Sequence, residues 1–230
     1  MKKINLVAIM LIVALASFSQ AVKDRNVIPV AVNLNQVLRM TITNGGNVEF
    51  VFNTIDDYKK GISSEAASAS QNPSSSQSMY KTDFTVSSST RWSLTYGAEE
   101  ATFLGTDNAS TTFALDNVGF TISNLGLKSF EGAGNAKAAT AAASLFSTPT
   151  DNANEVAALQ TYPVLLIEDN GTANANAGDG ADNSFTLNWR CGTAEAGKIV
   201  PMNGVKLIDQ SPSPAPDRYV VNVLFDLAIN

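Results

Sequence analysis

Residues 219–229 read Tyr-Val-Val-Asn-Val-Leu-Phe-Asp-Leu-Ala-Ile, with an apolar side chain at every second position. Successive side chains of an extended chain point to opposite faces, so one face of this segment is wholly apolar and the other is mixed. At about 3.3 Å per residue the segment would form a strand roughly 35 Å long, which needs a covering sheet or a partner strand. The apolar face consists of Tyr219, Val221, Val223, Phe225, Leu227 and Ile229.

A second alternating segment lies near the other end of the chain. The even-numbered positions from 30 to 42 are apolar with one exception, and residues 44–47 read Asn-Gly-Gly-Asn. Gly and Asn accept positive φ, which makes this tetrapeptide a strong turn signal. The even positions from 48 to 52 are apolar again. The pattern therefore predicts a β-hairpin over residues 30–52 whose two arms share one apolar face.

Shorter alternating runs occupy much of the remaining sequence, with turn residues between them. An Ala-rich stretch over residues 137–146 has strong helix formers instead. We expect an all-β chain, an antiparallel β-sandwich of about ten strands of jelly-roll or immunoglobulin-like type, with a short helical insertion near residues 135–160. The runs that predict strands include residues 84–86, 92–96, 118–122, 163–168 and 185–189.

The first 21 residues have the features of a secretory leader. Two lysines precede an apolar run over residues 4–18, and residues 19–21 read Ser-Gln-Ala, which suits a cleavage site. The apolar run is short for a membrane helix, which takes about 20 residues. We predict a signal peptide over residues 1–21 and a single domain over residues 22–230 with no membrane span. The expected location is extracellular or on the cell surface, with the periplasm as the alternative.

The charge of the mature chain argues against two kinds of partner. Cleavage removes two of the 15 basic residues and none of the 21 acidic ones, which leaves 13 basic residues and a net charge of −8. Nucleic acids and anionic membranes bind to clustered Lys and Arg side chains. We therefore expect neither as a partner.

The chain contains one cysteine, Cys191, so it cannot form an internal disulfide. We interpret Cys191 as a buried thiol that packs as a small apolar side chain. The alternative is an intermolecular disulfide or a reactive thiol. A secreted domain of this length without disulfides must be stabilised by an ordinary hydrophobic core, and a content of 44% hydrophobic residues suffices for one.

The residue types present give little support to an enzyme. The chain has no histidine, which excludes a Ser-His-Asp triad, a Cys-His pair and histidine-bearing metal sites. No glycine-rich loop has the spacing of a phosphate-binding site. The acidic residues fall mostly in predicted turns, where a solvated carboxylate is the ordinary explanation. We expect a non-enzymatic protein.

Calcium is the one metal that the sequence suggests, and we expect no other cofactor. Carboxylate and amide oxygens, the ligands that Ca²⁺ prefers, gather in the loop after residue 168. Their spacing does not match an EF-hand, and such residues are also common in ordinary turns. The candidate ligands are Asp169, Asn170, Asp179 and Asp182, with Glu168 and Asn183 beside them.

Three aromatic residues, Trp92, Tyr96 and Trp189, could provide a platform for a sugar ring. All three stand at core-facing positions of predicted strands. We therefore predict that they pack in the core instead.

Two segments resemble parts of known bacterial surface proteins. Residues 84–95 read Phe-Thr-Val-Ser-Ser-Ser-Thr-Arg-Trp-Ser-Leu-Thr, which resembles a strand–turn–strand unit of bacterial secreted β-sandwich domains. The closing alternation is similar to the terminal strands of fimbrial and surface-layer subunits. The resemblance implies assembly by exchange of a strand between neighbours. The chain departs from those families in having neither paired cysteines nor a cysteine at the cleavage site.

These observations favour a secreted structural or adhesive surface protein, a fibre or matrix subunit that assembles by β-strand exchange or edge pairing. Residues 211–216 read Ser-Pro-Ser-Pro-Ala-Pro, a semi-rigid tether that would deliver the closing strand to a partner. The partner would be a second copy or another cell-surface component. Two alternatives stay open: the closing strand completes its own domain, or the protein is a monomeric carbohydrate- or surface-binding module.

Overall fold

The computed structural model describes residues 28–64, 73–76, 79–126, 139–142, 144–146, 155–169, 176–196 and 199–230. The predicted leader, residues 1–21, lies outside these described residues. Within them, no helix has the length and apolar character needed to cross a membrane. The chain divides into two units, residues 1–35 and residues 36–230.

Short strands make up most of the second unit. Its first half contains β1 (Leu38–Asn44), β2 (Ile62–Ser63), β3 (Ser75–Ser76), β4 (Lys81–Ser88), β5 (Trp92–Ala98), β6 (Thr102–Gly105), β7 (Thr112–Ala114) and β8 (Val118–Asn124). Its second half contains β9 (Ala139–Ala141), β10 (Ala157–Ala158), β11 (Val164–Asp169), β12 (Ser184–Cys191), β13 (Tyr219–Val220) and β14 (Val223–Ile229). The helical elements described are α2 (Ile55–Lys60) and the 3₁₀ turns η1 (Leu115–Asn117) and η3 (Leu207–Asp209).

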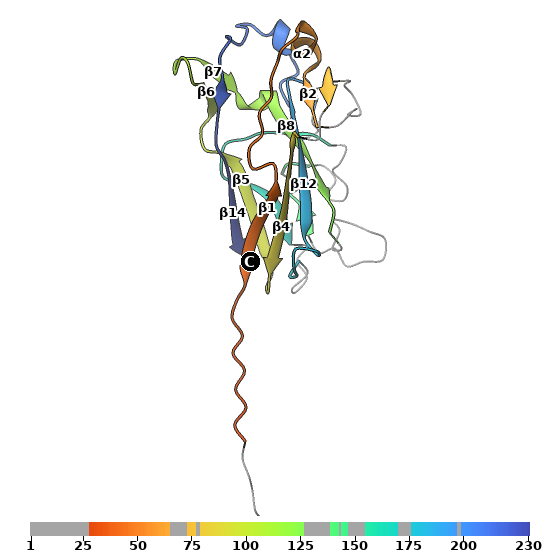
Figure 1. Cartoon of the computed structure of the whole chain (residues 1–230), viewed down its shortest axis with the longest axis vertical. Coiled ribbons are helices and arrows are strands. Elements are labelled where there is room, and N and C mark those ends of the chain that lie inside the picture. Colours follow the sequence, from red (N-terminus) through yellow and green to blue (C-terminus); the bar gives the residue numbers. More distant parts are fainter. Residues whose placement is uncertain are drawn as a thin grey trace, which may run out of the picture. The chain divides into compact units, whose positions relative to one another are not determined.

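The largest sheet is built around β12 (Figure 1). One edge of β12 pairs with β8, from Phe185 opposite Asn124 to Cys191 opposite Val118. The other edge pairs with β4 and then, past the start of β4, with β2. β1 is added outside β4 and β10 outside β8, all in antiparallel orientation, while β3 joins β2 in parallel.

A second sheet has the order β14–β5–β11–β9, and a small third sheet has the order β13–β6–β7. In the second sheet β14 pairs with β5 over its full length, from Val223 opposite Ala98 to Ile229 opposite Trp92. β1 and β14 are therefore edge strands of the two main sheets.

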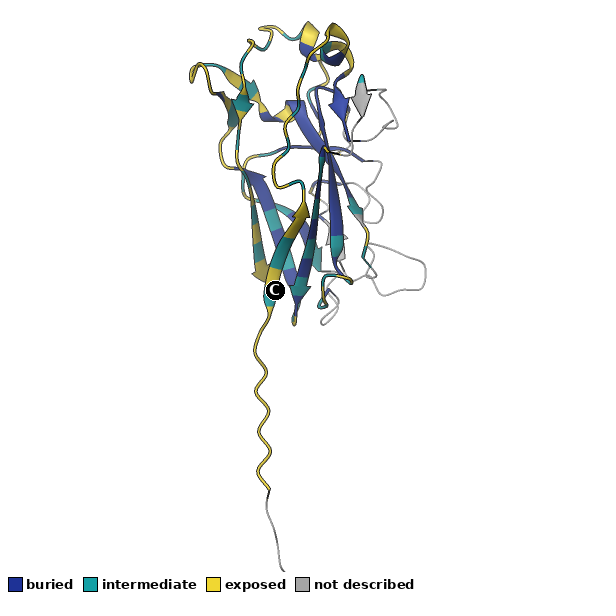
Figure 2. Ribbon diagram, in the orientation of Figure 1, coloured by how far each residue is buried: buried dark blue, intermediate teal, exposed yellow. Residues whose placement is uncertain are grey.

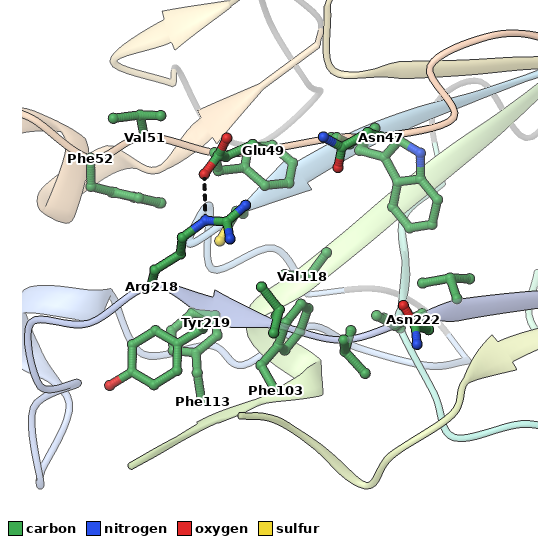
Figure 3. A pocket seen from close by; sticks show the side chains of 18 of the residues that line it. Asn47, Glu49, Val51, Phe52, Phe103, Phe113, Val118, Arg218, Tyr219 and Asn222 are labelled. Carbon is green, nitrogen blue, oxygen red and sulfur yellow. Dashed lines mark hydrogen bonds and ion pairs between the residues drawn. The ribbon is translucent and has the colours of Figure 1, made fainter. Parts of the chain in front are cut away.

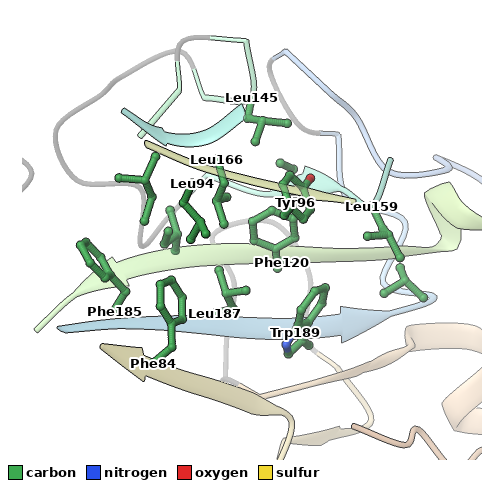
Figure 4. Packing of buried hydrophobic residues seen from close by; sticks show 14 of the residues in the cluster. Phe84, Leu94, Tyr96, Phe120, Leu145, Leu159, Leu166, Phe185, Leu187 and Trp189 are labelled. Carbon is green, nitrogen blue, oxygen red and sulfur yellow. The ribbon is translucent and has the colours of Figure 1, made fainter. Parts of the chain in front are cut away.

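The two main sheets face each other across one hydrophobic core (Figure 4). Alternation along β4 and β5 directs every second side chain inward, and β12 is buried on both faces. The Trp92 ring of β5 lies 5.9 Å from Phe185 of β12, and the Tyr96 ring of β5 lies 5.2 Å from Phe120 of β8. Figure 2 shows how strongly the buried residues concentrate on β8 and β12. The predicted antiparallel β-sandwich is confirmed.

The helix α2 is held by its caps. The Thr54 hydroxyl accepts a hydrogen bond from the Asp57 N–H, and the Asp57 carboxylate accepts one from the Thr54 N–H at 2.8 Å, which together make a capping box. Gly61, with φ of 75°, closes the helix in the left-handed region that favours glycine. The N-terminal cap fixes the end of the extended segment that precedes the helix, because the N–H groups of Asn53 and Thr54 donate to the Asp57 carboxylate.

The predicted hairpin over residues 30–52 is wrong. β1 pairs with β4, not with residues 48–52, which belong to no strand. Gly45, with φ of 67°, lets the chain leave the β1–β4 ladder against the backbone of Lys81. The chain then continues toward α2 instead of reversing (Figure 1). The turn residues therefore change the direction of the chain, but the segments before and after them do not pair with each other.

The described part of the first unit, residues 28–35, is extended and forms no strand. Val30, Val32 and Leu34, which were predicted to face a core, are between 75% and 91% exposed, and Ile28 is 82% exposed (yellow in Figure 2). We call residues 28–35 the N-terminal arm. The arm keeps the alternation of a strand without the sheet that such a strand needs.

The helical insertion predicted near residues 135–160 is not found where that region is described. Residues 139–141 form β9, which pairs with β11, and residues 157–158 form β10, which pairs with β8. Much of the remainder lies outside the described residues. β8 and β11 each have an edge that can pair with a further strand, and the residues in question pair there. The helix propensity of alanine amounts to only a fraction of a kcal/mol per residue, so this pairing outweighs it.

The closing segment is not one long strand. It divides into β13, which pairs with β6 of the third sheet, and β14, which pairs with β5 of the second. Residues 221–222 between them carry the chain from one sheet to the other. The alternation continues from β13 into β14, because the odd-numbered side chains point inward in both strands.

Candidate functional site

A groove with a volume of about 650 Å³ opens on the sandwich. Two extended segments flank it: residues 45–52, here called the first wall, and residues 214–223, here called the second wall. Figure 3 shows the two walls with the groove between them. The first wall continues from β1 and the second leads into β14, so the groove begins where the edge strands of the two main sheets diverge.

The first wall has a strand-like pattern without strand pairing. Val48, Phe50 and Phe52 are half-buried, whereas Glu49 and Val51 between them are exposed. The Phe50 ring stacks on Tyr80 at 4.7 Å, which attaches the wall to the body of the sandwich. Among the described residues, no hydrogen bond involves a backbone N–H or C=O of residues 46–52. The wall therefore presents backbone donors and acceptors that no described residue pairs with, as the edge of a sheet does.

The second wall is fixed along its outer side. Tyr219 and Val220 pair with β6, and the Thr106 N–H donates to the Arg218 carbonyl at 2.9 Å. Asp217 also holds the loop after β6, because its carboxylate accepts hydrogen bonds from Thr111 Oγ1 at 2.6 Å and from the Asp107 N–H at 3.0 Å. The second wall is consequently a firm support on one side and open to the groove on the other.

The floor of the groove is apolar and belongs to the core. It combines side chains from four strands and from the loops at that end of the sandwich. Burial raises the pKa of the Cys191 thiol, so the thiol stays protonated at neutral pH. The predicted burial of Cys191 is confirmed. The floor is lined by Phe103, Phe113, Val118, Leu159, Trp189, Cys191 and Leu207.

One ion pair joins the two walls. Arg218 Nε lies 3.0 Å from Glu49 Oε1, and Figure 3 shows the two side chains meeting between the walls. Both side chains are more than half exposed. Exposed ion pairs of this kind contribute little to stability and are weakened by salt, so this contact can open readily.

The Asp217 carboxylate gives the second wall a measurable pH dependence. Hydrogen bonds from Thr111 and from the Asp107 backbone lower its pKa to about 2. A depressed folded-state pKa stabilises the fold above the unfolded value near 4, and this contribution is lost as the pH falls toward 2. We expect the Asp107 amide resonance to titrate with a midpoint near pH 2 in NMR spectra. In Asp217→Asn this titration should vanish, whereas Glu100→Gln should leave it unchanged, and a midpoint near pH 4 in the native chain would contradict the hydrogen-bonded geometry.

The structure places the six predicted assembly-strand residues in two groups. Tyr219, Val221, Val223 and Phe225 line the groove. Leu227 and Ile229 lie farther along β14, beside β5. The face that was predicted to enter a partner thus forms part of the groove in its own chain. The prediction that this strand leaves the domain stays a prediction.

The predicted calcium ligands take part in other interactions. Asp169 is 3.3 Å from Arg91 Nη1 in an ion pair, and Asn170 lies outside the described residues. Asp179 Oδ1 accepts a hydrogen bond from the Asp182 N–H at 3.1 Å, which is an ordinary turn contact. Across the described ranges, no three or more His, Cys, Asp or Glu side chains are grouped to hold a metal ion.

The three aromatic residues considered as a sugar platform are core residues. Trp92 and Tyr96 are fully buried, and Trp189 is 6% exposed. Trp92 Nε1 donates to the Asn176 carbonyl at 2.7 Å, and Trp189 Nε1 donates to Thr82 Oγ1 at 2.9 Å. The predicted core packing is confirmed.

Sequence reasoning missed the first wall and the exposed arm as functional features. Both were assigned to one hairpin, because alternation identifies a strand-like segment and not its partner. The available signal was Gly45-Gly46, which allows a change of direction as well as a reversal.

No known protein family matches the chain, and no curated protein is significantly similar to it.

Proposed function

We propose that the chain is a secreted, non-enzymatic structural subunit that assembles on or outside the cell by adding an extended segment of a second copy to the groove. The observation that carries this proposal is the first wall, a strand-like segment whose backbone makes no hydrogen bond among the described residues. A strand lying against the wall would satisfy these groups, as in other β-strand additions.

The lining of the groove supports an apolar strand as the occupant. The floor consists of core side chains, so an inward-facing apolar residue would complete the sandwich. The charged groups Glu49 and Arg218 stand at the rim, where outward-facing residues of the strand would meet water. An alternating segment has this division between its two faces.

The runner-up, a monomeric carbohydrate- or surface-binding module, has less support. Sugar platforms need exposed aromatic rings, and in the part of the chain that the structure describes every Phe, Tyr and Trp is buried or half-buried. The resemblance of the closing segment to strands of fimbrial subunits supports assembly, and the proposed acceptor in this chain is the groove.

The size of the purified mature protein tests the proposal. We expect sedimentation and electron microscopy to show multimers or fibres that grow with concentration. Val221→Arg, which places a charge on the inward face of the second wall, should abolish them. Leu224→Arg is the matched control, since Leu224 is exposed on β14 and does not line the groove. A native protein that stays monomeric at every concentration would overturn the proposal.

A further inference from the structure

The N-terminal arm is the most exposed apolar segment of the described chain. Ile28, Val30, Val32 and Leu34 are between 75% and 91% exposed. Single exposed apolar residues are common, but four in regular alternation make a continuous apolar face, and such faces mark interaction sites. The arm therefore has the surface of a strand whose sheet is supplied by something else.

The other face of the arm suits a position at the mouth of a groove. It consists of Pro29, Ala31, Asn33 and Asn35, which are small or uncharged. Uncharged side chains would meet neither repulsion nor an unpaired charge at the rim formed by Glu49 and Arg218. Pro29 stands near the start of the arm, where a missing N–H is tolerated in a strand.

The arm and the first wall also agree in length. Each contains eight residues, which extend over about 26 Å at 3.3 Å per residue. An arm laid along the wall would bring four apolar side chains over an apolar floor. It would also pair its backbone with the wall residues that make no hydrogen bond among the described residues.

We propose that the N-terminal arm of one copy is the strand that fills the groove of the next copy. This inference rests on the proposed function and specifies its donor segment. Its consequence is a head-to-tail contact, in which the donor and acceptor surfaces of one chain differ, and such contacts propagate into filaments when they do not close into rings.

The reach of the arm favours a second copy over its own chain. The Val37 N–H donates to Ser89 Oγ at 3.0 Å and the Ser89 N–H donates to the Val37 carbonyl at 3.0 Å, which anchors the start of β1. The first wall begins at Gly45, after the far end of β1. A reversed arm would use about 23 Å of its about 26 Å length running back along the seven residues of β1. It could not place its four apolar side chains over its own groove.

An engineered cysteine at Val48, which is half-buried on the first wall and lines the groove, allows a direct test by disulfide trapping in a Cys191→Ser background, because the native Cys191 thiol is buried and stays protonated. Single cysteines are introduced into the full chain at Val30 and Val32, which share the apolar face, and separately at Ala31 and Asn33 as matched controls. Under a mild oxidant we expect Val30→Cys or Val32→Cys to give a ladder of dimers and larger species on a non-reducing gel. The yield should be roughly tenfold above that of either control, because strand side chains alternate between faces. Restoring Val48 should remove the ladder.

A second variant pair measures assembly without a thiol. Val30→Asp with Val32→Asp should weaken multimer formation on the order of 100-fold, whereas Ala31→Gln with Asn33→Gln, which keeps the outward face uncharged, should leave most of the multimer formation intact. The arm is exposed in the described structure, so both variants should keep the native melting temperature.

The outcomes separate the inference from the proposed function. Multimers that persist in Val30→Asp, Val32→Asp, together with no ladder from either apolar-face cysteine, would overturn the arm as donor while the subunit proposal stands. A cross-linked monomer band would overturn the second copy as acceptor. Equal ladders from both faces would overturn strand insertion. A native chain that never multimerises would overturn the proposed function itself.

Discussion

Replacing Glu195 by alanine is expected to lower the free energy of unfolding by about 3–5 kcal/mol, the usual effect of removing one partner of a buried ion pair. Arg190 is fully buried and Glu195 is 4% exposed. Arg190 Nη1 lies 2.9 Å from both carboxylate oxygens of Glu195. The pair fastens the loop after β12 onto the outer face of the largest sheet. Chemical denaturation followed by tryptophan fluorescence measures the loss.

Two further variants distinguish a charge effect from a packing effect. Glu100→Ala, at an exposed turn position, should change stability by no more than about 0.5 kcal/mol. Arg190→Met combined with Glu195→Leu should be more stable than Glu195→Ala alone, since neither charge of this pair is then buried. A loss below about 1 kcal/mol in Glu195→Ala would show that the buried Arg190 guanidinium does not depend on Glu195 for its stabilisation.

Phe120→Ala is expected to cost a similar amount, about 3–5 kcal/mol, because it leaves a cavity where the two main sheets meet. The Phe120 ring is fully buried and lies 5.2 Å from Tyr96, 5.3 Å from Trp189 and 6.0 Å from Phe146. It therefore joins β8 of the largest sheet to β5 of the second. Thermal unfolding monitored by circular dichroism gives the change.

The matched control is Leu224→Ala, which truncates an apolar side chain that is 39% exposed on β14. We expect it to cost less than a third of the effect of Phe120→Ala, because little buried area is lost. Comparable losses in the two variants would show that the centre of the sandwich repacks around the missing ring.

The fold class could be predicted because alternation is a local property of the sequence. The patterns at residues 84–86, 92–96 and 185–189 lie in β4, β5 and β12, and their inward side chains form the core. The continuous apolar run at residues 163–168 lies largely in β11, whose Leu166 and Ile167 are fully buried between two neighbouring strands. The two-residue period of the apolar side chains thus predicted which residues face inward.

The pairing of strands could not be predicted in the same way. β1 takes β4 as its partner across 39 to 50 residues of sequence, although a glycine turn stood directly after β1. Backbone hydrogen bonds are nearly independent of side-chain identity, so alternation in two neighbouring segments does not make them partners. The short strand at residues 139–141 forms in an Ala-rich sequence for a related reason. The edge of β11 is available for pairing there, and this pairing determines the secondary structure.

The candidate site is hard to see in sequence because its first wall is a strand-like segment that pairs with no described strand. The closing segment was identified as important, and its residues Tyr219 and Val221 do line the groove. The N-terminal arm has the same alternation as any core strand, and its exposure is a property of the fold alone. Only the folded structure distinguishes the closing segment, which pairs within its own chain, from the N-terminal arm, which forms no strand.

The contact between Glu49 and Arg218 makes the groove sensitive to its medium. The attraction between exposed charges extends over a Debye length, which is about 8 Å at 0.15 M ionic strength and about 30 Å at 0.01 M. The two walls are therefore drawn together more strongly in dilute water than in brine. For a subunit that works outside the cell, as proposed, salinity would set how often the groove stands open, and the rate of growth of an assembly would follow the salt content of its surroundings.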